Sequence, residues 1–258
     1  MSECFRTRRA VLASLTLGAL APTLLLSRQA LAQSDTDARA IVARADEIRF
    51  PRESFQTDIT VTNFSDGAQG DERRYRVLSR GNENTIVLTI SPASERGQAL
   101  LMRGRDLWVF MPTVSQPVRL SLAQRLTGQV ANGDLARANF AGDYEPALSG
   151  SEVLDGTECH VLELTAVDRG VTYARVRYWV AQEDSRPLKA EFYAVSGRLL
   201  KTCRYEHFRD MAGRVRPTRL VMEDALKAGD YSVLEYEAMA LRDLPERMFT
   251  REYLRRLQ

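Results

Sequence analysis

The sequence has few of the residues on which metal sites and nucleophilic catalysis depend. Its 258 residues include three cysteines and two histidines, and neither His160 nor His207 has the spacing of a metal ligand. There is no G-x-S-x-G motif, and Ser149 in Ser-Gly-Ser lacks the context of a nucleophile elbow. No set of nucleophile, base and acid stands out among the predicted loops. We therefore expect a protein without enzymatic activity, metal or cofactor.

Lysine is also rare. Lys189, Lys201 and Lys227 are the three lysines, and the other 33 basic residues are arginines. A GC-rich genome explains this bias more simply than phosphate recognition does. The net charge of +2 becomes −1 without the first 32 residues, because these carry four arginines and one glutamate. The charge therefore gives no field that would attract a polyanion, and nucleic acid is not an expected partner.

A long hydrophobic run occurs only near the N-terminus. Three arginines precede an uncharged run over residues 10–26, and Ala-Leu-Ala at residues 30–32 offers small side chains at both positions that a signal peptidase reads. The run contains Pro22 and is short for a bilayer core of about 30 Å, although a retained anchor is the alternative. We predict that residues 1–32 are a cleaved signal peptide and that residues 33–258 form the mature domain.

The signal also bears on the export route. Residues 7–12, Thr-Arg-Arg-Ala-Val-Leu, resemble a twin-arginine signal, but paired arginines occur in ordinary secretory (Sec) signals as well. Cys4 lies in the cationic start, and no cysteine lies near the cleavage point where a lipid could be attached. The prediction is a soluble periplasmic protein, with the route left open.

The mature chain is expected to begin with a helix and to continue mainly as strands. Asp35 can cap a helix that ends before Pro51, and a second short helical candidate covers residues 120–126. In the remaining chain apolar residues alternate with polar ones, which is typical of strands with one face in water. The predicted strands cover residues 55–64, 73–80, 85–91, 99–102, 107–111, 159–167, 173–181, 188–194, 199–208, 215–224 and 231–241.

These eleven strands are joined by short turn-like linkers, which favours one antiparallel meander in a single domain. A single sheet with one apolar face must curl or be covered in order to bury that face. The helix before Pro51 and the candidate over residues 120–126 are the segments available as a cover.

Several motifs occur in the order and spacing of a known family. They are W-x-x-x-P at residues 108–112, G-x-x-x-N-G-D at 128–134, Asp-Tyr at 143–144, G-x-x-C-x-x-L-x-L at 156–164 and Gly-Arg-Leu-Leu-Lys at 197–201. Together they make the chain resemble the outer-membrane lipoprotein-sorting family, a branch of the LolA/LolB-like superfamily. His160 departs from the pattern, because an aromatic residue is commoner there.

The resemblance implies a strongly curved, half-closed antiparallel barrel of about eleven strands, with a helical lid over an apolar cavity. Proteins of this kind carry acyl chains, lipids or lipoproteins through the periplasm, and many serve lipid-exporting transporters of the resistance-nodulation-division (RND) class. It therefore implies a monomeric carrier whose partners are acyl chains and such a transporter. The alternative is a periplasmic sensor or adaptor that uses the same fold for protein contacts.

The apolar sheet face supplies the candidates for contact with an acyl chain, which gains about 0.8 kcal/mol for each methylene it buries. The same residues also fit an ordinary core. A face packed solid, with no cavity larger than a few waters, would favour the adaptor. The candidates are Leu88, Ile90, Val109, Met111, Leu162, Leu164, Tyr178, Phe192, Leu220 and Met222.

Two further features leave alternatives open. Cys159 and Cys203 both lie in predicted strands, and the sequence permits either a disulfide or two buried thiols without a catalytic role. The loop over residues 128–134 is either a simple turn, with Gly133 at positive φ, or a part of a moving lid.

Overall fold

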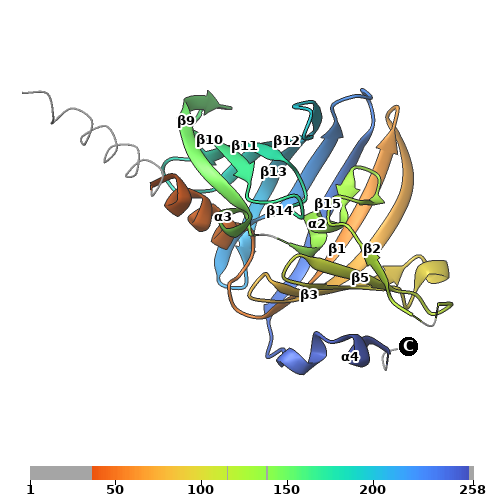
Figure 1. Ribbon diagram of the computed structural model, residues 1–258. Helices are drawn as coiled ribbons and strands as arrows, with labels where there is room; N and C mark the ends of the chain where they lie inside the picture. The colour runs from red at the N-terminus through yellow and green to blue at the C-terminus, as the bar shows by residue number, and fades with distance from the viewer. Residues whose placement is uncertain (1–36, 115, 138, 256–258) are drawn as a thin grey trace, which may run out of the picture.

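Thirteen strands form one large antiparallel sheet in the computed structural model, which describes residues 37–114, 116–137 and 139–255 (Figure 1). The predicted signal peptide and its cleavage site lie outside these residues. Consecutive strands are neighbours within each half of the sheet, β1 to β6 and β9 to β15, and the pairing of β1 with β15 joins the two halves. The strands are β1 (Phe55–Ser65), β2 (Ala68–Arg80), β3 (Asn84–Ser91), β4 (Ala99–Arg103), β5 (Asp106–Phe110), β6 (Val118–Leu120), β9 (Tyr144–Leu154), β10 (Thr157–Ala166), β11 (Arg175–Ala181), β12 (Pro187–Tyr193), β13 (Leu199–Met211), β14 (Arg214–Asp224) and β15 (Tyr231–Leu241).

The sheet is strongly curved but does not close, because β6 and β9 remain at its two edges. The register shifts at several points, for example between Thr62 and Phe64 in β1 and between Val161 and Leu162 in β10. In β13, His207 has a φ of 52° and is not paired with β14, although the register does not shift there. Register shifts of the kind seen in β1 and β10 bend a strand and increase its twist, so they help the sheet to wrap around its apolar face. The expected half-closed barrel is confirmed.

The helical parts of the chain are short. A helix covers residues 37–49, followed in the chain by η1 (Ala93–Glu95), α2 (Asn132–Ala136), α3 (Phe140–Asp143), η2 (Glu246–Met248) and α4 (Arg251–Arg255). The helix over residues 37–49, α2 and α3 cover the concave face of the sheet (Figure 1). In the part of the chain that is described, no helix has the length and apolarity needed to cross a bilayer.

All eleven predicted strands are present, and four strands were not predicted. The helix expected over residues 120–126 is wrong, because this segment leads into a hairpin of β7 (Arg125–Thr127) and β8 (Val130–Ala131). Gly128 makes its turn with a φ of 49°, and a Cβ there would lie 1.9 Å from Oδ1 of Asn63. Glycine is therefore required both by the turn and by the close approach of the hairpin to β1.

Apolar side chains form two main clusters on opposite faces of the sheet. The larger one fills the concave side and includes the buried face of the helix over residues 37–49, together with Leu135 and Phe140 from α2 and α3. The smaller one lies on the convex side, where the C-terminal segment places Leu244, Phe249 and Leu254 over β3 and β4. The concave cluster contains the covering helices, so it is the place where a functional interior is expected.

Candidate functional site

Two separate segments cover the concave face, and we call them together the lid: residues 37–49 and residues 132–143, the second without the undescribed residue 138. The first segment places Ala38, Ile41, Val42 and Ala45 in the core, as its helical spacing predicts. The second segment adds Leu135, Ala136 and Phe140. The expectation of a helical lid is confirmed, although its second part is residues 132–143 and not residues 120–126.

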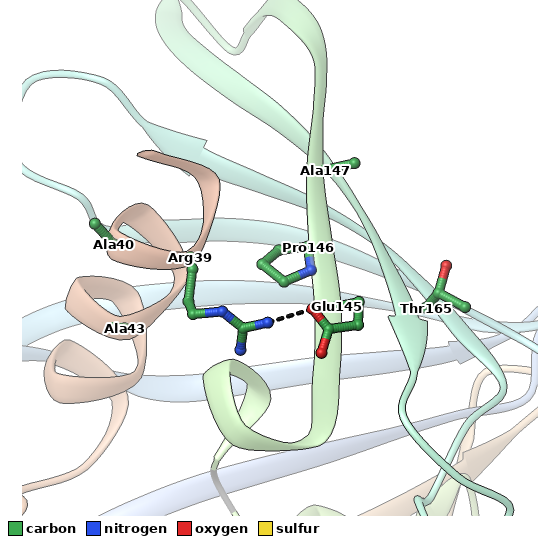
Figure 2. Close-up of a pocket in the computed structure, with 7 residues that line it drawn as sticks. All are labelled: Arg39, Ala40, Ala43, Glu145, Pro146, Ala147 and Thr165. Atoms are coloured by element: carbon green, nitrogen blue, oxygen red, sulfur yellow. Dashed lines mark hydrogen bonds and ion pairs between the residues drawn. The ribbon is translucent and has the colours of Figure 1, made fainter. Parts of the chain in front are cut away.

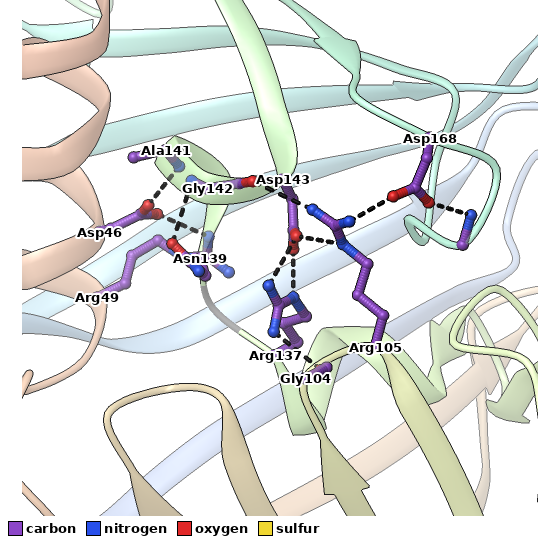
Figure 3. Close-up of polar contacts among 11 residues, drawn as sticks. Asp46, Arg49, Gly104, Arg105, Arg137, Asn139, Ala141, Gly142, Asp143 and Asp168 are labelled. Atoms are coloured by element: carbon purple, nitrogen blue, oxygen red, sulfur yellow. Dashed lines mark hydrogen bonds and ion pairs between the residues drawn. The ribbon is translucent and has the colours of Figure 1, made fainter.

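The last turn of the first lid segment brings a carboxyl and a guanidinium into the interior. Asp46 and Arg49 are only 7% and 8% exposed. Oδ2 of Asp46 accepts a hydrogen bond of 2.8 Å from the backbone N–H of Ala141 in α3, while its Oδ1 lies 3.6 Å from Nη1 of Arg49 (Figure 3). Asp46 therefore connects the two segments of the lid.

Aromatic rings surround the Arg49 guanidinium. Its Cζ lies 4.3 Å from the ring centre of Phe140 and 5.7 Å from that of Tyr205. Phe140 in turn meets Tyr144 and Tyr178 edge-on, with ring centres 5.4 Å apart in both pairs. A cation held against aromatic faces is attracted by their quadrupoles, and this partly offsets the cost of burying it.

Hydrogen bonding in this cluster is incomplete. Oδ1 of Asp46, Nη1 of Arg49 and the hydroxyls of Tyr144 and Tyr178 are buried without a hydrogen-bond partner among the described residues. A buried polar group without a partner costs about 1–3 kcal/mol. Because four such atoms meet where the lid contacts the sheet, this contact is not optimised for stability alone.

The buried position of Asp46 changes the pH at which its carboxyl loses a proton. Burial raises the pKa of this carboxyl to about 7, although the charge of Arg49 and the hydrogen bond from Ala141 oppose the shift. Asp143, also negative and close by, adds to the rise in the pKa. Asp46 is therefore protonated in a large fraction of molecules near neutral pH, and Arg49 then lacks a full counter-charge.

A second polar cluster fixes α3 to the loops at the end of the barrel (Figure 3). Asp143 is paired with Arg137, whose Nη2 lies 2.7 Å from Oδ1 of Asp143, and accepts a bond of 3.0 Å from Nε of Arg105. Arg105 also pairs with Asp168 in the loop between β10 and β11, and Arg137 donates to the carbonyl oxygen of Gly104 at 2.9 Å. Three separate loops are thus held together through one carboxylate.

The N-G-D motif forms α2 and attaches it to the sheet. Asp134 accepts from Nζ of Lys201 in β13 at 2.6 Å and from the hydroxyl of Tyr173 at 2.9 Å. Gly133 does not have positive φ, so that expectation is wrong. A Cβ at Gly133 would lie 2.1 Å from Oγ1 of Thr172, and glycine is needed because the two segments pack so closely.

The interior beneath the lid is almost full. The enclosed cavity between the lid and β12 to β14 has a volume of about 10 Å³, which holds about one water. Its walls include Arg49, Phe140 and Tyr144, together with the predicted ligand residues Phe192, Leu220 and Met222. The expected preformed cavity for an acyl chain is therefore wrong for this conformation. The lid side chains, with Arg49 and Phe140 among them, occupy the space that a chain would need.

The other predicted ligand residues divide between the two faces. Leu162, Leu164 and Tyr178 lie in the concave core, and Val109 packs against it. Leu88 belongs instead to the convex cluster, while Ile90 and Met111 are half-buried and belong to neither. Contact of any of these residues with a ligand stays a prediction.

A groove lies beside the lid on the outside of the molecule. It has a volume of about 750 Å³ and lies between the helix over residues 37–49 and the edge strand β9 (Figure 2). Ala40, Ala43 and Pro146 give it apolar walls, and the ion pair between Arg39 and Glu145 crosses it. The groove therefore follows the seam between the lid and one edge of the sheet.

Cys159 and Cys203 are free thiols, so the disulfide alternative is wrong. Cys203 lies in the concave core and Cys159 in a small cluster with Val161 and Trp179. Burial raises the pKa of Cys203 to about 12 and also raises that of Cys159. The histidines lie in predicted strands, His160 in β10 and His207 in β13.

Asp46, Arg49, Arg105 and Arg137 were not identified from the sequence. Asp46 and Arg49 were hidden on a helix whose charged positions look solvated, although their spacing of three residues puts them on one face. Asp143 belonged to a quoted motif, but its role as a link between loops gave no signal in the sequence.

Comparisons with known proteins agree on the fold. A protein-family model described as "Uncharacterized protein" matches residues 81–256. A crystal structure of a LolA superfamily protein from Nitrosomonas europaea is 62% identical, with a TM-score of 0.80, and the match covers 84% of this chain and 98% of that one. No curated protein matches the chain.

Two more distant crystal structures share the fold alone. A DUF1329 family protein from Desulfovibrio piger is 21% identical with a TM-score of 0.74, covering 86% of this chain and 99% of that one. A domain from Vibrio parahaemolyticus described as an outer membrane lipoprotein-sorting protein is 19% identical with a TM-score of 0.73, covering 85% and 99%.

Proposed function

This chain belongs to the LolA superfamily, and we propose that it is a periplasmic carrier that takes up the acyl part of a lipid or lipoprotein beneath its lid. The acyl chain of the ligand would enter the concave core when the lid opens, and it would take the place of the lid side chains there. The complex would then pass its cargo toward the outer membrane or a lipid-exporting transporter of the RND class. The carrier acts as a monomer and without catalysis.

The observation that carries this proposal is the incomplete hydrogen bonding where the lid meets the sheet. Asp46, Arg49, Tyr144 and Tyr178 each bury a polar atom without a partner among the described residues, next to the apolar residues of the concave core. Each such atom makes the closed state less stable by about 1–3 kcal/mol, so opening the lid recovers part of its own cost. An acyl chain supplies the remainder at about 0.8 kcal/mol for each buried methylene.

The arrangement of the lid supports the same proposal. Its two segments, residues 37–49 and 132–143, are far apart in the sequence and contact the sheet through side chains rather than by strand pairing. Asp46 links the segments to each other, whereas Asp134 and Asp143 link the second one to the sheet and its loops. A few polar contacts therefore control access to the apolar interior.

The packed interior favours a second candidate, a periplasmic sensor or adaptor, because such a protein needs no cavity. The groove beside β9 and the unpaired outer edge of that strand offer a place for protein contacts in this case. A sheet edge readily accepts a further strand. The two candidates differ in what the interior contains when the protein is in its own compartment.

The test is to purify the periplasmic protein without detergent and to measure bound lipid by native mass spectrometry. A carrier should retain lipid, and Met222→Trp, which fills the enclosed cavity, should remove it. Val195→Trp is the matched control, because Val195 is exposed on the surface. Lipid retained equally by a folded Met222→Trp protein would place the ligand outside the interior. A wild-type protein free of lipid would contradict the carrier and favour the adaptor.

A further inference from the structure

The interior cluster around Arg49 has the composition of an anion site. The guanidinium is always charged and has only hydrogen-bond donors. Nη1 has no hydrogen-bond partner in the described chain, and neither have the nearby hydroxyls of Tyr144 and Tyr178. All three residues are at least nine-tenths buried. Three donors without acceptors therefore meet in one enclosed place.

The three donor groups form one continuous cluster. Arg49 and both tyrosines contact the same ring, that of Phe140. Burial raises the pKa of the Tyr178 hydroxyl, and the facing Arg49 guanidinium opposes that rise, so the hydroxyl and the cation are close. Arg49 and Tyr144 also line the enclosed cavity of about 10 Å³, where Phe192, Leu220 and Met222 supply apolar walls.

Two carboxylates also line this cavity, but Asp134 is paired with Lys201 and Asp143 with Arg137. The carboxyl nearest to Arg49 is Asp46, and its oxygen is 3.6 Å away, too far for an ordinary hydrogen bond. Burial raises the pKa of Asp46 to about 7, so near neutral pH the acid is often uncharged and is itself a donor. The charged groups that face Asp46 are Arg49 on its own helix and Asp143 on α3.

We propose that this cluster binds the acidic headgroup of an amphiphile, a carboxylate or a phosphate joined to an acyl chain. Arg49 pairs with the anion, and Tyr144 and Tyr178 donate hydrogen bonds to its oxygens. The attached chain follows the apolar wall of Phe192, Leu220 and Met222. This inference rests on the proposed carrier function, and it adds that the carrier selects acidic over uncharged lipids.

The binding site forms only when the lid moves, because the present cavity holds about one water. An entering headgroup would pair these three donors, and the lid would close again over a satisfied cluster. The hydrogen bonds that the closed state lacks are thus the ones that the ligand supplies. This explains why polar side chains occupy the centre of a core that otherwise favours apolar ones.

The experiment measures retention of radiolabelled ligands by the delipidated full-length mature protein on gel filtration. The ligands are palmitate, a lysophosphatidic acid with one palmitoyl chain, methyl palmitate and inorganic phosphate. We expect both acidic lipids to bind at least about tenfold more tightly than the methyl ester, as a charged hydrogen bond would provide. Phosphate alone should bind weakly, because it lacks the chain.

Variants separate a binding role from a structural one. Arg49→Met should bring the ratio of acid affinity to ester affinity close to one, while Arg49→Lys should retain part of the preference. Tyr144→Phe and Tyr178→Phe each remove one hydroxyl without a partner, so they should weaken acid binding without loss of thermal stability. They also keep the test open if Arg49→Met does not fold. Arg44→Met is the control, because Arg44 is exposed on the same helix.

The outcomes are distinct. Equal binding of acids and ester, or an acid preference that survives Arg49→Met and both tyrosine variants, would overturn this inference and leave the carrier intact. Phosphate binding as tight as that of the phospholipid would assign the cluster to a free anion and overturn the headgroup assignment. Failure of every amphiphile to bind would overturn the carrier and this inference together.

Discussion

Raising the pH from about 4 to about 7 should weaken the closed lid through Asp46. In the closed state burial raises the pKa of this carboxyl from 3.8 to about 7. Closing the lid therefore takes up a proton in this pH range. A group whose pKa is raised by folding gives stability that is fully present below its unfolded pKa and is lost as the pH rises through the folded one. A difference of about three pKa units corresponds to at most about 4 kcal/mol.

Asp46→Asn isolates this contribution. Asparagine has the shape of the protonated acid and can still accept the hydrogen bond from Ala141, but it does not titrate. Other carboxyls change the stability of the protein in the opposite direction. Hydrogen bonds from arginines lower the pKa of Asp58 and Glu95, so the stability that these two groups contribute is lost as the pH falls. The difference between wild type and variant removes this background. Asp37→Asn, an exposed change on the same helix, is the control.

The assay is urea unfolding at several pH values between about 4 and 8, combined with hydrogen exchange of the Ala141 amide. The stability of wild type relative to Asp46→Asn should fall as the pH rises from 4 to 7 and should then stay constant. Protection of the Ala141 amide should fall in the same interval, beyond the change in intrinsic exchange rate. The same pH dependence in wild type and Asp46→Asn would show that Asp46 does not hold the lid, and the reasoning would be refuted.

Three further outcomes are expected. Lys201→Met should destabilise the protein by about 3–5 kcal/mol in urea unfolding, because it leaves Asp134 buried without its cation, and adding Asp134→Leu should recover most of the loss. Gly133→Ala should lower the thermal midpoint more than a surface Gly→Ala change does, because its Cβ meets another side chain at 2.1 Å; an unchanged midpoint would contradict this. Replacing both Cys159 and Cys203 by serine should leave ligand binding intact in the folded protein, as measured by lipid retention, although stability falls.

The strands were predictable because their signal is local. Val176, Tyr178 and Val180 alternate with charged residues, and a period of two fixes which side chains share a face. β9 was missed because it is an edge strand with few buried residues, and Pro146 and Gly150 interrupt its pattern. Edge strands carry less of the alternation on which such a prediction depends.

The alternation predicted where the strands lie, but it predicted less well which side of the sheet each apolar face belongs to. In β3 the predicted ligand residue Leu88 and its neighbour Ile86 belong to the convex cluster, whereas Val87 belongs to the concave core. Both faces of this strand are covered, one by the lid and one by the C-terminal segment. An apolar face in the sequence therefore indicates burial, but it does not say which element provides the cover.

The packing of the interior could not be predicted from the sequence, for a different reason. Alternation shows that a face is apolar, but the volume beneath it depends on which side chains of the lid enter. Here Arg49 and Phe140 enter, and an arginine on an amphipathic helix does not look like a core-filling residue. A charge that is buried at the cost of unpaired donors is a poor way to fill a core and a good way to hold a site ready for an anion. Arg49 fills part of the cavity, and for this reason its replacement is the best test of what the cavity binds.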